Sequence, residues 1–189
     1  MKLFFSFIFV SGIFAISCNS GYTQEVSDEY LITDSKLDSL LSNNDSNIIV
    51  FYTSWCNGSK ETIENFYFEV QDSINSKGLN NRIILLLADE RVDTGLINEQ
   101  RRKGFMSYCI GDAGTSAMEN RSAIKKYINE KFRGKEINWL VVGFKIPVEL
   151  LISNNKNIIN VSDEFLPFKY SAERILGLKI GKVEPNLNK

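Results

Sequence analysis

The chain has 189 residues, of which 43% are hydrophobic and 24% charged, and its formal net charge is −1. This is the composition of an ordinary globular protein, and the length suits one domain with an insertion. The charge argues against a nucleic-acid partner, because no surplus of Lys and Arg exists to neutralise phosphates. Histidine is absent, which removes Ser-His-Asp and Cys-His catalysis within the chain. The sequence has no metal-ligand set and no phosphate loop, so we expect no metal and no cofactor.

The first 17 residues predict an export signal rather than part of the fold. Lys2 precedes an apolar segment at 3–16, LFFSFIFVSGIFAI, which has the length of a secretory signal and is short for a membrane span. The segment stops just before Cys18. It resembles a bacterial lipobox, in which small residues precede a cysteine that is lipidated and becomes the first mature residue. The alternative is an ordinary signal peptide cleaved nearby, with Cys18 incidental.

These features divide the chain into a leader, a tether and a domain. Residues 1–17 are the predicted signal peptide, 18–29 a polar tether, 30–180 the folded domain and 181–189 a polar tail. The expected location is the cell envelope of a bacterium, with the domain facing the periplasm or held as an outer-membrane lipoprotein by a lipid anchor on Cys18. An exported compartment permits disulfides, so Cys56 and Cys109 both need an interpretation.

The first half of the domain predicts alternating strands and helices. A short strand is expected at 30–33, followed by a helix that Ser35 caps. Apolar runs at 48–53 and 82–88 predict strands, the second of them covered on both faces. Between these strands, five apolar positions share the spacing of one helical face: Ile63, Phe66, Tyr67, Val70 and Ile74.

Residues 93–145 predict a helical insertion before the next strand. A helix is expected at 96–103, and three glycines at 104–115 favour a loop that includes Cys109. Ser116 is expected to cap a second helix ending at Arg133-Gly134. The apolar residues 137–144 suit either a strand or a packing loop. Strands at 145–152 and 158–161 then predict a hairpin, and a closing helix is expected at 171–178.

The residues of chemical interest stand where the first buried strand gives way to a helix. Trp55 and Cys56 end the apolar run, Asn57 and Gly58 are small or turn-forming, and Ser59 opens the helical pattern. A cysteine in this place lies at a helix N-terminus, where unsatisfied N–H groups and the helix dipole favour the thiolate over the thiol.

This order of strand, Trp-Cys-x-x and helix resembles the active-site region of the thioredoxin family. The resemblance covers about residues 30–178 and implies an α/β fold with a central mixed β-sheet flanked by helices. It also implies that Ile146 and Pro147 match the family's cis-proline segment, which lies opposite the cysteine and lets the preceding residue pair with substrate backbone. Alternatively, Pro147 is an edge-strand proline with a trans bond.

Two departures from the family pattern weaken the case for a general disulfide reductase. Ser59 stands where a thioredoxin has its second cysteine, and Val50 stands where many thioredoxins have a buried acid used in proton transfer. By resemblance, Cys56 and Ser59 are the catalytic residues. Cys56 can attack a disulfide, and Ser59 can donate a hydrogen bond to the thiolate but cannot resolve the mixed disulfide. The expected substrate contacts are Trp55, Asn57, Gly58, Ile146 and Pro147.

Three interpretations of Cys56 stay open. In the first, Cys56 is the nucleophile of a monothiol protein that acts on cysteine-containing envelope proteins or with a partner thiol. In the second, it is a remnant in a fold now used as a binding module or accessory lipoprotein. In the third, it forms a structural disulfide with Cys109. Cys109 itself is either a small buried residue or a resolving cysteine that the glycine-rich segment brings over Cys56. A disulfide would need the two Cα atoms within about 7 Å.

Overall fold

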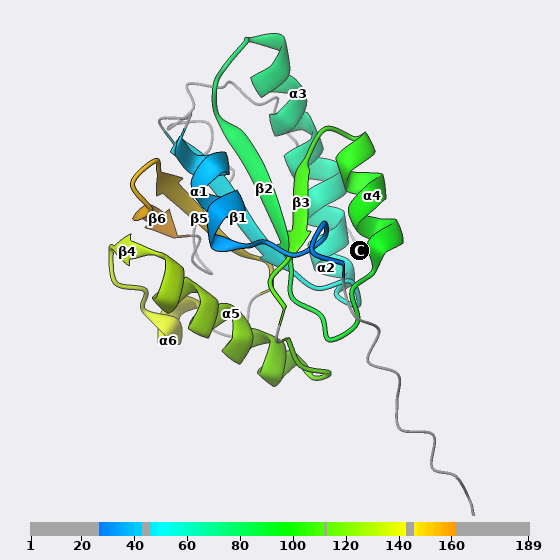
Figure 1. Ribbon diagram of the computed structural model, residues 1–189, viewed down its shortest axis with the longest axis vertical. Helices are drawn as coiled ribbons and strands as arrows, with labels where there is room; N and C mark the ends of the chain where they lie inside the picture. The colour runs from blue at the N-terminus through cyan, green and yellow to red at the C-terminus, as the bar shows by residue number, and fades with distance from the viewer. Residues whose placement is uncertain (1–26, 43–45, 112, 143–145, 162–189) are drawn as a thin grey trace, which may run out of the picture.

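The computed structural model describes residues 27–42, 46–111, 113–142 and 146–161, arranged as in Figure 1. The signal peptide, the predicted lipidation site Cys18, most of the tether, the closing helix at 171–178 and the polar tail lie outside the described residues. In chain order the elements are α1 (Asp34–Ser42), β1 (Ser46–Tyr52), α2 (Asn57–Thr62), η1 (Ile63–Tyr67), α3 (Phe68–Ser76), β2 (Arg82–Leu87), α4 (Thr94–Arg102), β3 (Met106–Cys109), α5 (Ala117–Lys131), β4 (Arg133–Gly134), α6 (Trp139–Val142), β5 (Val148–Ser153) and β6 (Asn157–Val161).

A six-stranded sheet forms the centre of the domain, in the order β3-β2-β1-β5-β6-β4. β1 pairs in parallel with β2, and β2 with β3, whereas β5 runs antiparallel to β1 and β6 antiparallel to β5. Residues 47–52 of β1 and 83–87 of β2 are all buried, as their continuous apolar sequences predict for strands covered on both faces. The expected mixed sheet flanked by helices is therefore confirmed.

Helices cover both faces of this sheet (Figure 1). Alternate residues of β1 point to opposite sides. Ile49 and Phe51 pack in the layer with α1 and α5, whereas Val50 and Tyr52 pack in the layer with η1, α3 and α4. η1 is a π-helical turn between α2 and α3, so one helical stretch runs from 57 to 76. The two apolar layers fix the central strands, and with them the point at which β1 ends.

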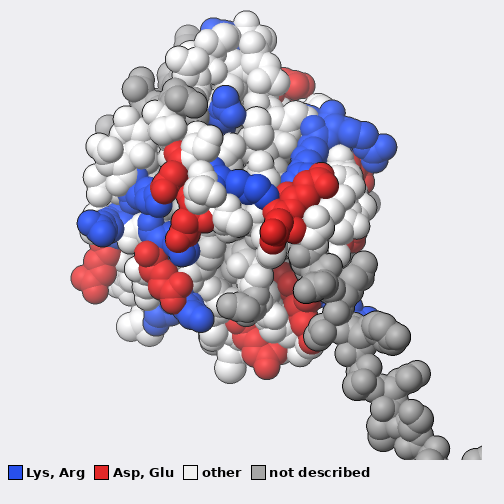
Figure 2. All heavy atoms as spheres, in the orientation of Figure 1, with Lys and Arg blue, Asp and Glu red and all other residues white. Residues whose placement is uncertain are grey.

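Acidic and basic side chains are interspersed on the outer face of α1 and α5 (Figure 2). Lys131 Nζ on α5 lies 2.7 Å from Asp34 Oδ1, and Lys156, in the turn between β5 and β6, pairs with Asp38. The hydrogen bond from Lys131 lowers the pKa of Asp34. Exposed ion pairs add little to stability, so the apolar layer beneath α1 provides most of its attachment.

The segment for which the sequence predicts a loop, 104–115, contains the strand β3. β3 pairs in parallel with β2, and Leu31 forms a single bridge to Cys109 where a strand at 30–33 is predicted. The glycines do mark turns, because Gly104 has a φ of 90° and Gly111 a φ of 66°, but they bound a strand instead of filling a loop. A strand of four residues is too short for its alternating pattern to stand out in the sequence.

The cap of α5 is the predicted one, and the cap of α1 is not. Ser116 Oγ accepts the Glu119 N–H, and the Glu119 carboxylate accepts the Ser116 N–H, which together form a capping box. α1 begins at Asp34, one residue before the predicted cap Ser35, and Thr33 Oγ1 accepts the Lys36 N–H at 3.3 Å. Neighbouring Thr and Ser residues make the choice between caps hard to read from sequence.

Two short elements at 133–142 are absent from the sequence prediction. Arg133 and Gly134 form β4, which pairs in parallel with β6. Residues 139–142 form the helical turn α6, and Arg121 Nη2 donates to the Trp139 carbonyl oxygen at 2.9 Å, which holds this turn beside α5. The insertion is therefore a mixture of helices and short strands rather than purely helical.

A buried hydrogen-bond network ties this insertion to the central strand. Tyr52 Oη donates to Gln100 Oε1 at 2.7 Å, and Ser107 Oγ donates to the same oxygen at 2.6 Å. The network joins β1, α4 and β3. In contrast, Tyr127 Oη on α5 is buried and has no hydrogen-bond partner among the residues that the structure describes.

Removal of these two tyrosine hydroxyls should affect stability differently. Tyr52→Phe breaks a buried hydrogen bond and should lower the free energy of unfolding by about 1 kcal/mol. Tyr127→Phe removes an unpaired buried hydroxyl and should leave the free energy of unfolding unchanged or raise it. Urea unfolding of the two variants measures the difference, and a larger loss for Tyr127→Phe would contradict the hydrogen-bond assignment.

Candidate active site

Cys56 is the residue immediately before α2. β1 ends at Tyr52, and after a turn Cys56 adopts the extended backbone of a helix N-cap, with φ −86° and ψ 105°. Its carbonyl oxygen accepts the N–H of Ser59 at 3.0 Å and the N–H of Lys60 at 3.2 Å. The Cys56 thiol accepts no capping hydrogen bond from the first turn of α2.

The Cys56 sulfur faces a segment that is remote in sequence. Sγ donates a weak hydrogen bond to the Ile146 carbonyl oxygen at 3.7 Å, across a separation of 90 residues. The Ile146–Pro147 peptide bond is cis, Pro147 is buried and Ile146 is half-buried. The antiparallel pairing of β1 with β5 brings the two segments together. Phe51 lies opposite Val148, so the residues that follow Phe51 and those that precede Val148 leave the sheet at the same end.

Exposed neighbours of Cys56 form a surface beside the half-buried sulfur. Trp55 is 50% exposed, and Asn57 and Gly58 are also exposed. A Cβ atom at Gly58 would lie 4.0 Å from Cys56 Sγ, so the glycine leaves more room on that side of the sulfur. The structure thus places Ile146 against the half-buried sulfur and leaves Trp55, Asn57 and Gly58 exposed next to it in the chain, whereas Pro147 is buried.

Ser59 stands where the family pattern has its second cysteine. It is fully buried in the first turn of α2, and its hydroxyl has no hydrogen-bond partner in the described part of the chain. The hydrogen bond that the resemblance implies from Ser59 to Cys56 is therefore not formed in the structure. Because a hydroxyl cannot form a disulfide, Ser59 supplies no second sulfur to the site.

Cys109 is the last residue of β3 and does not lie in a loop over Cys56. It is 1% exposed, and its Sγ donates to the Tyr30 carbonyl oxygen at 3.2 Å. β2 separates β3 from β1, and both Cys56 and Cys109 are free thiols. Burial raises the pKa of the Cys109 thiol, which keeps it protonated. The structure therefore contains a buried, inert thiol at the position considered for a resolving cysteine.

Glu149 is a buried carboxyl that the sequence prediction does not include. Glu149 on β5 is 3% exposed and lies opposite Val50, the position at which the family pattern has its acid. Tyr67 Oη donates to Glu149 Oε1 at 2.7 Å. Burial and the neighbouring carboxyl raise the pKa of Tyr67, so the phenol keeps its proton and acts as the donor. The only hint of Glu149 in the sequence is that it is the single acidic residue of the largely apolar strand VELLIS, which begins just after Pro147.

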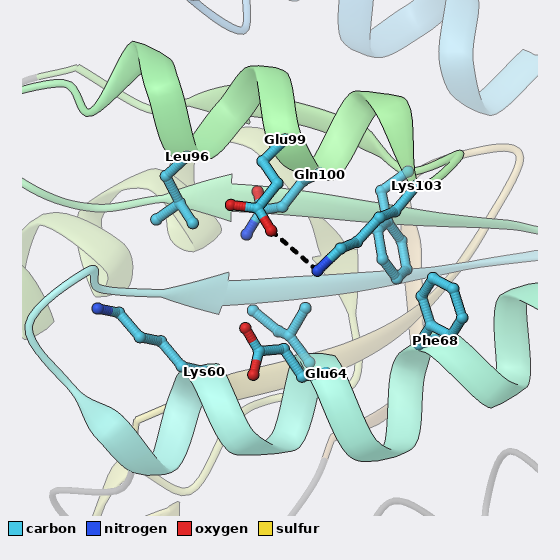
Figure 3. Close-up of a pocket in the computed structure, with 9 residues that line it drawn as sticks. Lys60, Glu64, Phe68, Leu96, Glu99, Gln100 and Lys103 are labelled. Atoms are coloured by element: carbon cyan, nitrogen blue, oxygen red, sulfur yellow. Dashed lines mark ion pairs between the residues drawn. The ribbon is translucent and has the colours of Figure 1, made fainter.

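A narrow groove separates α4 from the helical stretch that follows Cys56 (Figure 3). Lys60 borders the groove on one side and Leu96 on the other, and Glu99 forms an ion pair with Lys103 at 3.0 Å along α4. The groove has a volume of about 20 Å³, which is room for little more than one water molecule.

These features define a thioredoxin-like fold. A buried strand leads through a short turn to Cys56, a helix starts at the next residue, and the Ile146-Pro147 segment that precedes the antiparallel strand β5 lies against the cysteine. Among the described residues, no group of three His, Cys, Asp or Glu side chains is placed to hold a metal ion. Within the same residues, no helix combines the length and the apolar character needed to cross a membrane.

Comparison with known proteins gives similarity in fold only. No protein-family model matches the sequence, and no curated protein does. The chain is similar to the solution structure of a thiol:disulfide interchange protein from Bacteroides sp., with 14% identity, a TM-score of 0.46 and coverage of 75% of this chain and 76% of that one. For copper-bound ScoI of Arabidopsis thaliana the identity is 15%, the TM-score 0.45 and the coverage 74% and 86%. For a thioredoxin-family thiol:disulfide interchange protein from Chlorobium tepidum the identity is 15% and the TM-score 0.43, with coverage of 74% of this chain and 82% of that one.

The two described cysteines should differ in reactivity. Cys56 is half-buried and Cys109 is buried, so an alkylating reagent should modify Cys56 at least ~10-fold faster in the folded chain, because reaction requires an accessible thiolate. Peptide mass spectrometry reads each cysteine separately, and urea should abolish the difference. Equal rates in the folded chain would contradict the burial of Cys109.

The raised pKa of Cys109 also makes stability depend on pH. The folded chain keeps the Cys109 proton to a higher pH than the unfolded chain, so the free energy of unfolding should fall as pH rises above the ordinary thiol value of about 8.5. Cys109→Ala should remove this part of the pH dependence, which urea unfolding at several pH values measures. An unchanged slope in the variant would show that Cys109 is not its source.

Proposed function

We propose that the chain is an exported, membrane-anchored protein that exchanges thiols and disulfides through the single cysteine Cys56. The observation that carries this proposal is the position of Cys56 Sγ, which lies at the start of a helix, 3.7 Å from the Ile146 carbonyl oxygen. A nucleophilic sulfur and a backbone carbonyl are thereby offered together to an approaching polypeptide. The substrates are cysteine-containing proteins of the cell envelope, or a partner thiol.

The reaction begins with attack of the Cys56 thiolate on one sulfur of a substrate disulfide. A new bond forms between Cys56 and that sulfur, the substrate disulfide breaks, and the other substrate sulfur leaves as a thiolate that takes up a proton. Ser59 cannot complete a second exchange, and Cys109 is buried two strands away. Release therefore requires a thiolate from outside the chain or a second cysteine of the substrate, which attacks the substrate sulfur and expels Cys56.

The neighbours of Cys56 have distinct parts in this scheme. Trp55 offers a half-exposed aromatic surface for apolar groups of the substrate. The backbone next to Pro147 offers hydrogen-bonding groups to an extended substrate segment. Asn57 and Gly58 border the sulfur on the solvent side. Together they favour polypeptide substrates over small disulfides.

A lipid on Cys18 is the proposed anchor, on the basis of the lipobox-like sequence at the end of the leader. Wild-type chain produced in a bacterium should partition into the detergent phase of a detergent extraction. The reason is that two acyl chains on one cysteine are enough for stable membrane anchoring, whereas a single chain is not. Cys18→Ser should move the chain to the aqueous phase or leave the leader uncleaved. Aqueous partition of the wild-type chain would reject the anchor.

A second sulfur in the site should shorten the life of the mixed disulfide. The wild-type chain should accumulate a covalent complex with a disulfide-bonded peptide, because it has no internal thiol to release it. Ser59→Cys should lower the steady-state amount of that complex by about tenfold or more, since intramolecular attack has a high effective concentration. Non-reducing gels quantify the complex.

Two further variants serve as controls for this trapping experiment. Cys56→Ser should form no complex, and Cys109→Ser should trap as much peptide as wild type because Cys109 is buried away from Cys56. A complex that persists in Cys56→Ser would rule out Cys56 as the nucleophile. A large increase in trapping with Cys109→Ser would instead identify Cys109 as a resolving thiol.

The alternative function is a non-catalytic binding module on the same fold. Two exposed apolar side chains in the insertion favour it: Met118 is 68% exposed and Leu140 is 92% exposed. Under this alternative, Cys56→Ser would keep full partner binding, and Met118→Ser with Leu140→Ser would abolish it. These substitutions are a cleaner test than deletion of 104–115, which would remove β3 from the sheet.

A further inference from the structure

A buried hydrogen bond joins the helical stretch that follows Cys56 to the strand that follows Pro147. Tyr67 is the last residue of the π-helical turn η1, and its hydroxyl donates to Glu149 Oε1 on β5 at 2.7 Å. Tyr67 is fully buried and Glu149 is 3% exposed, so water competes little for either group and the bond is stronger than an exposed one.

On the side of β5, this bond lies near Pro147. Glu149 is two residues along β5 from Pro147, which is about 7 Å at the rise of a strand. On the helix side, Ser59, Ile63 and Tyr67 are the buried positions of successive turns, and they run down from the turn that contains Cys56. The bond therefore connects the two elements whose ends provide the sulfur and the carbonyl.

Tyr67 stands at the end of a π-helical turn. A π turn inserts one extra residue into the helical repeat and rotates the side chains that follow. In this chain the π turn ends at Tyr67. The preceding residue, Phe66, is half-buried and packs edge-to-face against the Tyr67 ring, with 4.9 Å between the ring centroids. Helix packing thus fixes the ring, and the hydrogen bond fixes its hydroxyl on β5.

We propose that Tyr67 and Glu149 are positioning residues for Cys56, because their hydrogen bond holds the active-site helix against β5 at the spacing that a polypeptide substrate needs. The inference rests on the proposed exchange function. A polypeptide must reach the sulfur and the backbone beside Pro147 at the same time, so it depends on that spacing. A small disulfide needs only the sulfur and is insensitive to it.

Two disulfides with the same leaving group separate these requirements. In one, nitrothiobenzoate is joined to a short cysteine peptide, and in the other it is joined to mercaptoethanol. Cys56 thiolate attacks the peptide or mercaptoethanol sulfur, the disulfide breaks, and nitrothiobenzoate leaves as a coloured thiolate while the Cys56 proton passes to solvent. Its absorbance gives the rate for the full-length chain, and mass spectrometry confirms that the adduct is on Cys56.

Loss of the hydrogen bond should slow only the peptide reaction. Tyr67→Phe and Glu149→Leu should each lower the peptide rate by about tenfold, because a misplacement of 1 Å can cost up to about 100-fold, and leave the mercaptoethanol rate within about twofold. Glu149→Gln keeps an oxygen that can accept from Tyr67 and should restore most of the peptide rate. A role in stability alone would not produce this selectivity or this rescue.

Tyr52→Phe is the matched control. Tyr52 is equally buried and packs in the same apolar layer, but its hydroxyl bonds to Gln100 on α4 instead of β5. This variant should lose stability without changing the ratio of the two rates. If Tyr67→Phe lowers both rates equally or neither, or if Glu149→Gln is as slow as Glu149→Leu, the positioning role is wrong. If the unmodified chain reacts with neither disulfide, the exchange function itself is rejected and the positioning role with it.

Discussion

The site depends on the antiparallel pairing of β1 with β5. This ladder joins a strand that ends just before Cys56 to a strand that starts just after Pro147, and it places Cys56 Sγ 3.7 Å from the Ile146 carbonyl oxygen. Both strands lie inside the sheet with apolar layers on each face, so the contact is set by the core and not by the loops themselves. Any change that shifts the register of β5 by one residue would turn Glu149 to the other face and separate the two halves of the site.

The two cysteines that the structure describes differ in their access to a partner. Cys56 is half-buried and can reach a partner, whereas Cys109 is buried in β3 with its thiol donating to Tyr30. Ser59 fills the place of a second sulfur with a buried hydroxyl that has no partner in the described residues. Under the proposed function, a chain with these groups forms a mixed disulfide and needs a thiol from outside to release it. That requirement distinguishes the proposed function from that of a two-cysteine reductase.

The central sheet and the place of Cys56 could be predicted from sequence, because long apolar runs and the Trp-Cys step are strong local signals. The elements that were missed are short or depend on partners. β3 has four residues between glycines, β4 has two residues that are strand only through pairing with β6, and α6 is a single turn held by Arg121. In the sequence, Glu149 is only a single acidic residue in an apolar strand. Its register opposite Val50 and the hydrogen bond that it accepts from Tyr67 are visible only in the structure.

The central claim is that Cys56 and the Ile146 carbonyl act on the same polypeptide. An experimental structure of the chain trapped with a disulfide-bonded peptide tests this claim most directly. The account predicts a bond from Cys56 Sγ to the peptide cysteine, with the peptide backbone running in an extended conformation beside Ile146 and Pro147. A peptide bound to Cys109, or one that leaves Cys56 pointing away from Ile146, would contradict it.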